Sequence, residues 1–257
     1  MIAPAPDRAT RAYHDFLRRA KGFWARDLYA AVARDFRAAA PPGGFPDADE
    51  AEAALATRAR YRYFAWLERH LQRLKYASPR GILATVDAER PRLAAALDAA
   101  RAAAEARGEL RLDPALALPR YYTAVEFHQH PGGVWSDPLA GVAYDVGRQT
   151  TLPAHLDPDE IHRRFTAAVP DGAYRRILDL GCGTGRSTLP FAARFPAAEL
   201  HGIDVSAPCL VRASERSHAA GVAVRWSQQA AERTDFPDGY FDLVHSTFLL
   251  HEVPRPA

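Results

Sequence analysis

The residues best suited to chemistry are glycines and an acid gathered in residues 175–187, RRILDLGCGTGRS. Gly181, Gly183 and Gly185 come directly after a short apolar run that predicts a buried strand, and Asp179 lies two residues before the first of them. Because glycine has no Cβ, it lets the backbone turn sharply and lets a ligand lie against it. The pattern therefore predicts a strand that ends in a ligand-binding loop.

This loop does not fit the fingerprint of dinucleotide-binding proteins. That pattern, GxGxxG, needs a third small residue at the position of Arg186, whereas the third glycine of this chain comes one place earlier. A nicotinamide-dependent enzyme is therefore a minor alternative.

The stretch LDLGCGTGRS resembles the first motif of class I S-adenosylmethionine-dependent methyltransferases, whose core is Rossmann-like. The resemblance implies that Asp179 faces the methionine ammonium of the cofactor, directly or through water. It also implies that the loop of Gly181, Cys182, Gly183 and Gly185 passes under the ligand. S-adenosylmethionine is accordingly the expected cofactor.

A second acid follows at the expected place. The next predicted strand ends in ELHGIDVS, which puts Asp204 nineteen residues after Gly185. Ligands of doubly wound sheets bind at the carboxyl ends of the strands, and a carboxylate there can accept both ribose hydroxyls. We therefore place Asp204 and its neighbour Val205 in the cofactor site, although Asp204 could instead cap the helix that begins near Pro208.

The stretch QQAAERTDFPDGYFDLVHSTFLLHEVP resembles the third and fourth motifs of the same family. The acidic residue that commonly meets the adenine amino group falls on Ala230, which has no hydrogen-bonding side chain. The resemblance implies that Gln229 or Glu232 takes its place and that the backbone N–H of Ala231 meets the ring. Ser246, on the strand that runs toward the site of methyl transfer, completes the expected cofactor contacts.

The acceptor side is expected to come from residues 121–155 and from the end of the chain. AYDVGR resembles a stretch in which Tyr144 covers the cofactor and Arg148 approaches its carboxylate, with an ordinary loop aromatic and a solvated arginine as the open alternative. His251 follows the last predicted strand and is the candidate general base. Methyl transfer often needs only alignment and desolvation, so a base is not required.

A metal site is not expected. His128, His130 and Asp137 lie close together in EFHQHPGGVWSD, a combination that can bind a metal ion. Histidines with structural roles are commoner, so we interpret these residues in that way.

The elements that position these residues divide the chain into three predicted parts. Residues 1–109 are expected to form a helical domain with helices at 10–40, from 47 to about 74, and at 91–107, packed as a bundle through stripes of apolar residues. Residues 110–157 are expected to be a connecting loop or lid. Residues 158–257 alternate helices and strands and predict a partial α/β domain with a mostly parallel, Rossmann-like sheet, its strands at 175–180, 199–204, 222–227 and 240–248.

Composition excludes several classes of protein. The chain of 257 residues is 48% hydrophobic and 25% charged, as in ordinary globular proteins, and its formal net charge of +2 does not favour nucleic acid as a partner. No signal sequence or membrane span is evident, so a cytoplasmic location is expected. The two cysteines, Cys182 and Cys209, indicate neither a disulfide nor a thiolate metal site.

The sequence stops at HEVPRPA, after the fourth predicted strand of the core, whereas the sheet of the family continues. Truncation of a longer protein is the favoured explanation, and completion of the sheet by another chain is the alternative. The function expected is transfer of a methyl group from S-adenosylmethionine to a small-molecule acceptor by in-line displacement. A non-catalytic, cofactor-binding subunit remains the alternative, and a homo-oligomer is left open.

Overall fold

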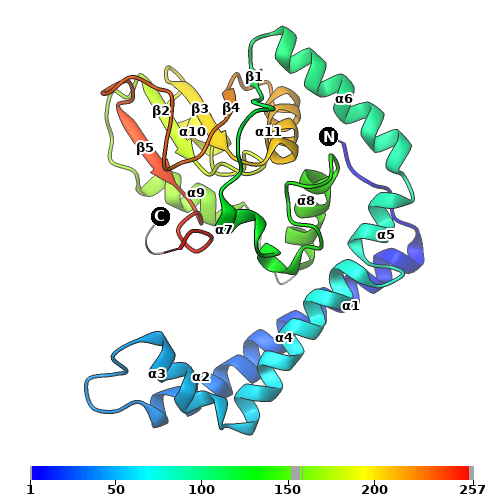
Figure 1. Ribbon diagram of the computed structural model, residues 1–257, viewed down its shortest axis with the longest axis vertical. Coiled ribbons are helices and arrows are strands. Elements are labelled where there is room, and N and C mark those ends of the chain that lie inside the picture. Colours follow the sequence, from blue (N-terminus) through cyan, green and yellow to red (C-terminus); the bar gives the residue numbers. More distant parts are fainter. Residues whose placement is uncertain (1, 152–156, 158, 255–257) are drawn as a thin grey trace. The chain divides into compact units, whose positions relative to one another are not determined.

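The computed structural model describes residues 2–151, 157 and 159–254 (Figure 1). The chain forms two compact units. The first, here called the core unit, comprises Met1–Ala5, Thr85–Val146 and Asp157–Ala257; the second, the helical unit, comprises Pro6–Ala84 and Gly147–Leu156. The three-part division drawn from the sequence stays a prediction. Every helix in the described residues is too short or too polar to span a lipid bilayer.

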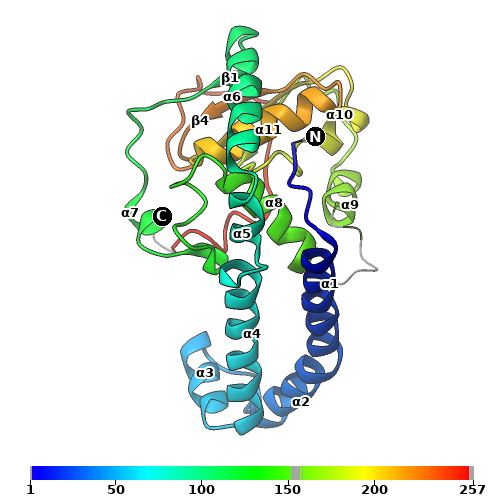
Figure 2. The ribbon, with the colours of Figure 1, turned by 90° about the vertical axis from the view of Figure 1, so that its right-hand side faces the viewer.

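The helical unit is built from an antiparallel pair of helical segments. Its elements are α1 (Arg8–Phe23), a π-helical turn η1 (Trp24–Leu28), α2 (Tyr29–Ala39), α3 (Ala48–Ala56), α4 (Ala59–Ala77) and the start of α5 (Ile82–Asp87). The side chains of Asp7 and Asp47 cap the first turns of α1 and α3 by accepting backbone N–H groups. The continuous run from α1 to α2 lies alongside α4 (Figures 1 and 2), which confirms a helix over most of residues 10–40. The second predicted helix is interrupted at residues 57–58.

The apolar stripe of these helices is only partly buried. Leu17, Val32, Leu67 and Leu71 are buried, as expected for core positions. The prediction of core packing is wrong for larger residues of the same stripe, since the following side chains are at least half exposed: Phe16, Phe23, Tyr63 and Trp66. A single partner helix covers only part of the surface of α1 and α4, so these large aromatic side chains lie at the edge of the helix–helix contact.

The core unit is organised around a parallel sheet of five strands. These are β1 (Leu110–Arg111), β2 (Arg176–Leu180), β3 (Glu199–Asp204), β4 (Arg225–Gln228) and β5 (Leu243–Ser246). Their order is β1-β4-β3-β2-β5, and every neighbouring pair is parallel. The predicted α/β fold with a Rossmann-like parallel sheet is thereby confirmed. The two-residue strand β1 was not predicted, because so short a run carries no periodicity.

Helices surround this sheet. They are α6 (Arg90–Ala106), α7 (Arg120–Thr123), a 3₁₀ turn η2 (Phe127–Gln129), α8 (Ala140–Thr151), α9 (Glu160–Ala168), α10 (Leu189–Arg194) and α11 (Ala207–Ala219). Helix α11 contacts β3 and β4, and α9 contacts α10. Helix α6 packs against α11 (Figure 2), whereas the sequence predicted that it would join the first two helices of the chain.

Helix α8 lies where the sequence predicted a loop. Its glycines suggested irregular structure, but they serve close packing instead. A Cβ on Gly141 would stand 2.5 Å from the carbonyl oxygen of Pro208, and a Cβ on Gly147 would stand 2.7 Å from the hydroxyl of Tyr76. Glycine in a helix costs about 1 kcal/mol relative to alanine. At these two positions that cost allows close packing against Pro208 and Tyr76. The prediction of irregular structure over 110–157 is therefore wrong for residues 140–151, which form a helix, while a lid role for the segment stays a prediction.

Candidate active site

A pocket lies within the core unit, where the strands β2, β3, β4 and β5 end. Eight of the residues placed in the site from the sequence line it: Tyr144, Gly181, Gly183, Asp204, Val205, Gln229, Ala231 and Glu232. Because the strands are parallel, their carboxyl ends meet at one edge of the sheet and bring these residues together. The sequence motifs thus converge on one site.

The glycine loop gives this pocket its floor. Gly181, Gly183 and Gly185 all have positive φ, at 67°, 52° and 78°, a conformation that glycine adopts without strain. At Gly183 no heavy atom of the described residues lies within 4 Å of the place that a Cβ would take. At Gly185 a Cβ would stand 2.8 Å from the ring of Trp226. Gly183 therefore leaves room for a ligand, while Gly185 leaves room for the core.

Asp204 lies at the end of β3 and lines the pocket with a partly buried carboxylate. Its Oδ2 accepts the backbone N–H of Gly183 at 2.8 Å, and its Oδ1 accepts the N–H of Ser206 at 2.8 Å. Burial raises its pKa to about 6 in spite of these two hydrogen bonds, which lower it. Ser206 itself caps α11 by accepting the N–H of Cys209. Asp204 is consequently not the cap of that helix, and each of its oxygens keeps a lone pair for hydroxyl donors.

Asp179 is fully buried on β2 and does not line the pocket. Its Oδ2 accepts the hydroxyls of Ser187 and Thr188, at 2.6 and 2.7 Å. Oδ1 lies 3.5 Å from Nδ1 of His245 on β5 and has no hydrogen bond within the described part of the chain. Burial raises the pKa of Asp179 to about 7 and lowers that of His245 to about 4. The contact between Asp179 and a ligand ammonium stays a prediction.

The candidates for adenine contact differ in their availability. The amide of Gln229 is engaged at both ends, because Nε2 donates to Oγ of Ser227 and Oε1 accepts the N–H of Asp235. Glu232 is exposed at the pocket and accepts the hydroxyl of Tyr121. Glu232 is therefore the better of the two replacements for the acid that Ala230 lacks.

An aromatic wall closes the pocket, and the sequence analysis did not find it. Its aromatic members come from the segment around α7 and η2 and from the turn after β5: Tyr121, Tyr122, Phe127 and Phe248. Leu249 adds an apolar side chain beside them. Burial raises the pKa of Tyr122, and the charge of Asp204 raises it further. The doublet of tyrosines could have marked this segment, but only the fold brings it to the strand ends.

The remaining predicted residues are not among those that line the pocket. The side chain of Cys182 is buried, and its Sγ lies 3.1 Å from the place that a Cβ of Gly202 would take. Ser246 ends β5 without lining the pocket, whereas its neighbour Thr247 does line it. Arg148 belongs to the helical unit, and its role stays a prediction. His251 is exposed in the turn after β5, with Nε2 at 3.6 Å from Oε1 of Glu252.

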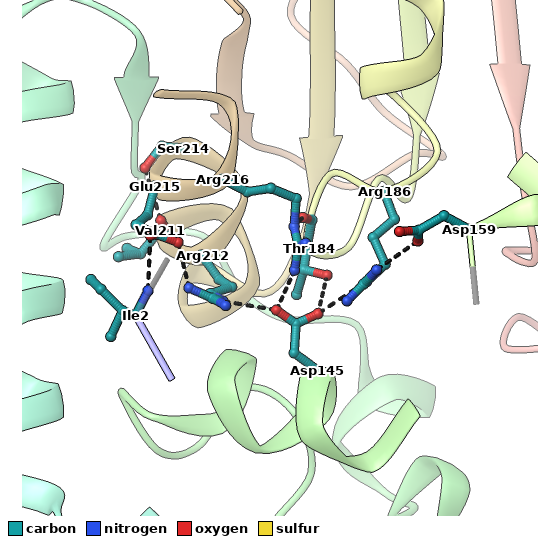
Figure 3. A network of polar contacts seen from close by, with 10 residues as sticks. All are labelled: Ile2, Asp145, Asp159, Thr184, Arg186, Val211, Arg212, Ser214, Glu215 and Arg216. Atoms are coloured by element: carbon teal, nitrogen blue, oxygen red, sulfur yellow. Dashed lines mark hydrogen bonds and ion pairs between the residues drawn. The ribbon is translucent and has the colours of Figure 1, made fainter. Parts of the chain in front are cut away.

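A buried ion-pair network connects α8, the glycine loop and α11 (Figure 3). Asp145 follows Tyr144 in α8. Its carboxylate accepts hydrogen bonds from Oγ1 of Thr184 at 2.9 Å, Nε of Arg186 at 3.3 Å and Nε of Arg212 at 2.8 Å. Arg216 also donates to Asp145 and, at 3.0 Å, to the carbonyl of Thr184. Burial raises the pKa of Asp145, but the charges of the three arginines outweigh burial and hold it below its usual value. The network fixes the tyrosine of the pocket to the loop beneath it.

Arg186 belongs to this network and does not line the pocket at the strand ends. Its Nη1 donates to Asp159 at 2.6 Å, and its side chain is buried between Asp159 and Asp145 (Figure 3). The residue that breaks the dinucleotide fingerprint in the sequence thus has a structural role behind the loop.

The histidines and the acid that lie close in sequence near residue 130 are not gathered around one point. Nδ1 of the buried His130 donates to the carbonyl of Gly133 at 3.0 Å. Asp137 pairs with Arg90 at 2.8 Å and accepts the N–H of Leu139. His128 turns instead toward Glu252, with Nε2 at 2.8 Å from Oε1.

The pocket offers groups that complement a nucleoside with an attached amino acid. Asp204 offers hydrogen-bond acceptors for ribose hydroxyls, Gly183 leaves open space at the loop, and the aromatic wall offers apolar contact to a base. These features match what the sequence motifs implied for S-adenosylmethionine.

Comparisons with known proteins point in the same direction. Residues 177–257 match the model of the family described as methyltransferase domain. The chain is 40% identical over 86 residues to demethylmenaquinone methyltransferase of Thermus thermophilus, a match that covers 34% of this chain and 39% of that protein. It is 32% identical over 108 residues to trans-aconitate 2-methyltransferase of Deinococcus radiodurans, which covers 38% of this chain and 40% of that protein. The chain thus spans less than half the length of these curated relatives.

Solved structures show the same partial likeness. One is phosphoethanolamine N-methyltransferase 2 of Haemonchus contortus in complex with S-adenosyl-L-methionine, which is 32% identical and has a TM-score of 0.28. The match covers 32% of this chain and 19% of that chain.

Proposed function

Since residues 177–257 form a methyltransferase domain on a class I, Rossmann-like sheet, we propose that this chain binds S-adenosylmethionine in the pocket of the core unit. Asp204 accepts the ribose hydroxyls, the backbone of Gly181–Gly183 passes under the amino acid part, and Glu232 with the N–H of Ala231 meets the adenine. The bound sulfonium carries the methyl group that is transferred.

One observation carries this proposal: the carboxylate of Asp204 and the open backbone of Gly183 form one wall of the same pocket, joined by a hydrogen bond of 2.8 Å. A sugar held by the acid is therefore held against bare backbone. The raised pKa of Asp204, about 6, leaves the group ionised at neutral pH, which is the form that accepts hydroxyl protons.

We further propose that a small molecule accepts the methyl group. The aromatic wall supports an acceptor with apolar or aromatic parts, because Tyr121, Tyr122, Phe127 and Phe248 line the same pocket as the glycine loop. The chain contributes alignment of the acceptor with the sulfonium carbon and removal of water, which are sufficient for in-line displacement on a good nucleophile. His251 is retained as the candidate base, although it is exposed and outside the pocket wall.

Calorimetric titration tests the cofactor. S-adenosylmethionine and NAD are titrated separately into the same preparation, whose folding is verified by a cooperative thermal transition. Stoichiometric binding of S-adenosylmethionine without binding of NAD supports the proposal. Binding of NAD alone, or of neither compound by a folded chain, contradicts it.

Methyl transfer needs its own experiment. Transfer of a radiolabelled methyl group is measured with a panel of hydroquinones and polycarboxylates, the acceptor classes that the names of the two relatives suggest. Tight cofactor binding without transfer to any member of the panel would favour the alternative, a non-catalytic cofactor-binding subunit.

A further inference from the structure

Three side chains that can bind a metal ion lie close together, and two of them line the pocket. They are His128 in η2 and His251 and Glu252 in the turn after β5, and all belong to the core unit. One ligand atom from each of the three side chains lies within 4.8 Å of the ligand atoms of the other two. His128 and Glu252 also line the pocket, so the cluster and the pocket share a wall.

Two of the three ligand–ligand distances are close to those of a tetrahedral metal site, and the third, between the two imidazoles, is at most 4.8 Å. Nε2 of His128 lies 2.8 Å from Oε1 of Glu252, and Nε2 of His251 lies 3.6 Å from the same oxygen. Ligands at 2.0–2.1 Å from a tetrahedral zinc ion stand about 3.3 Å apart. One of these distances must therefore lengthen and the other shorten by less than about 0.5 Å each. Both imidazoles are exposed, so their side chains are able to make this adjustment.

The two histidines share one carboxylate oxygen. Two imidazole rings, with centroids 5.5 Å apart, face a single carboxylate oxygen. That oxygen makes a hydrogen bond with His128, while His251 lies too far away for one. A divalent cation at their common point would bind all three groups at once.

The backbone on both sides of the cluster is held in a conformation that these residues rarely adopt. His128 has φ at 54°, and Phe248, three residues before His251, has φ at 64°. Non-glycine residues in the left-handed region are strained, and such residues cluster at functional sites.

We propose that His128, His251 and Glu252 form a binding site for one divalent transition-metal ion of the zinc type. Two imidazoles and one carboxylate are a ligand set that zinc accepts in sites that keep a fourth position open. Because His128 and Glu252 line the pocket, an ion held by them leaves a coordination position for an oxygen or nitrogen atom of a molecule bound there. The inference goes beyond the proposed function and does not depend on it.

This site also excludes another role for one of its members. A histidine whose Nε2 is bound to a metal ion does not take a proton from an acceptor, so His251 serves either as a ligand or as the candidate base. Metal titration therefore decides between the two assignments.

The test uses the full chain without a polyhistidine tag, after dialysis against EDTA and without S-adenosylmethionine. Zn²⁺ is titrated by calorimetry, and Co²⁺ is titrated by visible absorption, whose intense bands report four-coordinate cobalt. The variants are His251→Ala and Glu252→Gln, and the matched control is His218→Ala, an exposed histidine at the end of α11. Thermal melting of each protein shows whether it is folded. His251 is exposed, so its variant keeps the test valid if Glu252→Gln does not fold.

We expect one Zn²⁺ per chain in the wild type and in His218→Ala, with affinity weakened at least about tenfold in the other two variants. Loss of a mere second-shell partner already weakens metal binding 10–100-fold. Absence of stoichiometric Zn²⁺ binding by the wild type overturns the proposal and leaves a plain hydrogen bond between His128 and Glu252. Unchanged binding in His251→Ala and Glu252→Gln also overturns it, because the ion would then lie elsewhere.

Discussion

The carboxylate of Asp204 accepts the backbone N–H of Gly183 at 2.8 Å, which joins the end of β3 to the loop after β2. The same carboxylate accepts the N–H of Ser206, so the acid also fixes the start of α11. An acid that organises two loops and lines their pocket is held rigidly in place. A ligand that binds to it meets a preorganised surface and loses little affinity to ordering of the protein.

Asp204→Asn is expected to weaken S-adenosylmethionine binding by roughly 1–3 kcal/mol, because the amide cannot accept hydrogen bonds at both atoms. In the wild type the affinity should fall as the pH drops below about 6, where the folded-state pKa of Asp204 lies and the protonated acid begins to compete with the hydroxyl donors. The variant should lack this pH dependence. Calorimetric titrations of both proteins between pH 5 and pH 8 measure the two effects. Equal affinities at neutral pH would remove Asp204 from the cofactor site.

Gly183→Ala is expected to abolish or severely weaken cofactor binding while the chain still folds. The new Cβ enters open space in the pocket, and only the positive φ of 52° strains the backbone. Gly221→Ala is the matched control, since Gly221 has φ of 68° and equally open surroundings outside the pocket. Both variants should lose about 1 kcal/mol of unfolding free energy, measured by urea denaturation. Equal cofactor affinities in the two variants would show that no ligand lies against Gly183.

Gly185→Ala should act on the fold and not only on the ligand. Its Cβ would stand 2.8 Å from the buried ring of Trp226 and 3.1 Å from Ala213, so the core must shift. We expect a loss of unfolding free energy clearly above that of Gly221→Ala, by about 1–3 kcal/mol for overpacking. Urea denaturation of the two proteins makes the comparison, and equal stabilities would contradict the packing assigned to Gly185.

Asp145→Asn should be among the most destabilising substitutions in the core unit. It leaves Arg186, Arg212 and Arg216 buried without the carboxylate that they share, and breaking a buried ion pair costs about 3–5 kcal/mol. Asp98→Asn is the control, because Asp98 makes an exposed pair with Arg101 at 3.5 Å and should cost less than about 1 kcal/mol. A loss at Asp145 as small as that at Asp98 would mean that the network does not hold α8 to the glycine loop.

Asp179→Asn should stabilise the cofactor-free protein increasingly as the pH rises. The pKa of Asp179 is about 7 in the folded protein, against a model-peptide value of 3.8. Between these values the folded state holds a proton that the unfolded state has lost, so the unfolding free energy of the wild type falls as the pH rises from about 4 to about 7. Asparagine keeps an oxygen for the hydroxyls of Ser187 and Thr188 and does not ionise.

The stability difference between this variant and the wild type reports the carboxyl together with its effect on His245, whose Nδ1 lies 3.5 Å from Oδ1 of Asp179. The folded-state pKa of His245 is lowered to about 4, so this histidine adds stability as the pH rises toward 6.5. Denaturation at pH 4, 5.5 and 7 gives the slope. A pH-independent difference would show that Asp179 is ionised throughout, as a nearby cation would make it.

The parts of the site that local patterns encode were predictable. Asp204 and Gly183 lie in short motifs at strand ends, and parallel strands place such ends together, so their meeting at one edge of the sheet followed from the strand pattern. The expected cofactor came from the resemblance of these motifs to those of class I methyltransferases. Contacts across long stretches of chain were not predictable. His128 meets Glu252 across 124 positions, and Asp145 meets Arg216 across 71, and neither pairing has a local signal.

The sequence misled where a residue type serves two purposes. Gly141 suggested a loop but lets α8 approach the backbone of α11, and Trp66 suggested core packing but is 57% exposed. In each case the outcome depended on how closely another element packs against the residue, and the periodicity of the sequence does not report that packing.

The central claim is that the nucleoside lies between the glycine loop and Asp204, and a crystal structure with S-adenosylhomocysteine tests it most directly. We predict ribose hydroxyls within hydrogen-bond distance of the Asp204 carboxylate, with the amino acid part over Gly181–Gly183. Electron density for the compound at another place, or a crystal structure without the compound after soaking at saturating concentration, would contradict the account.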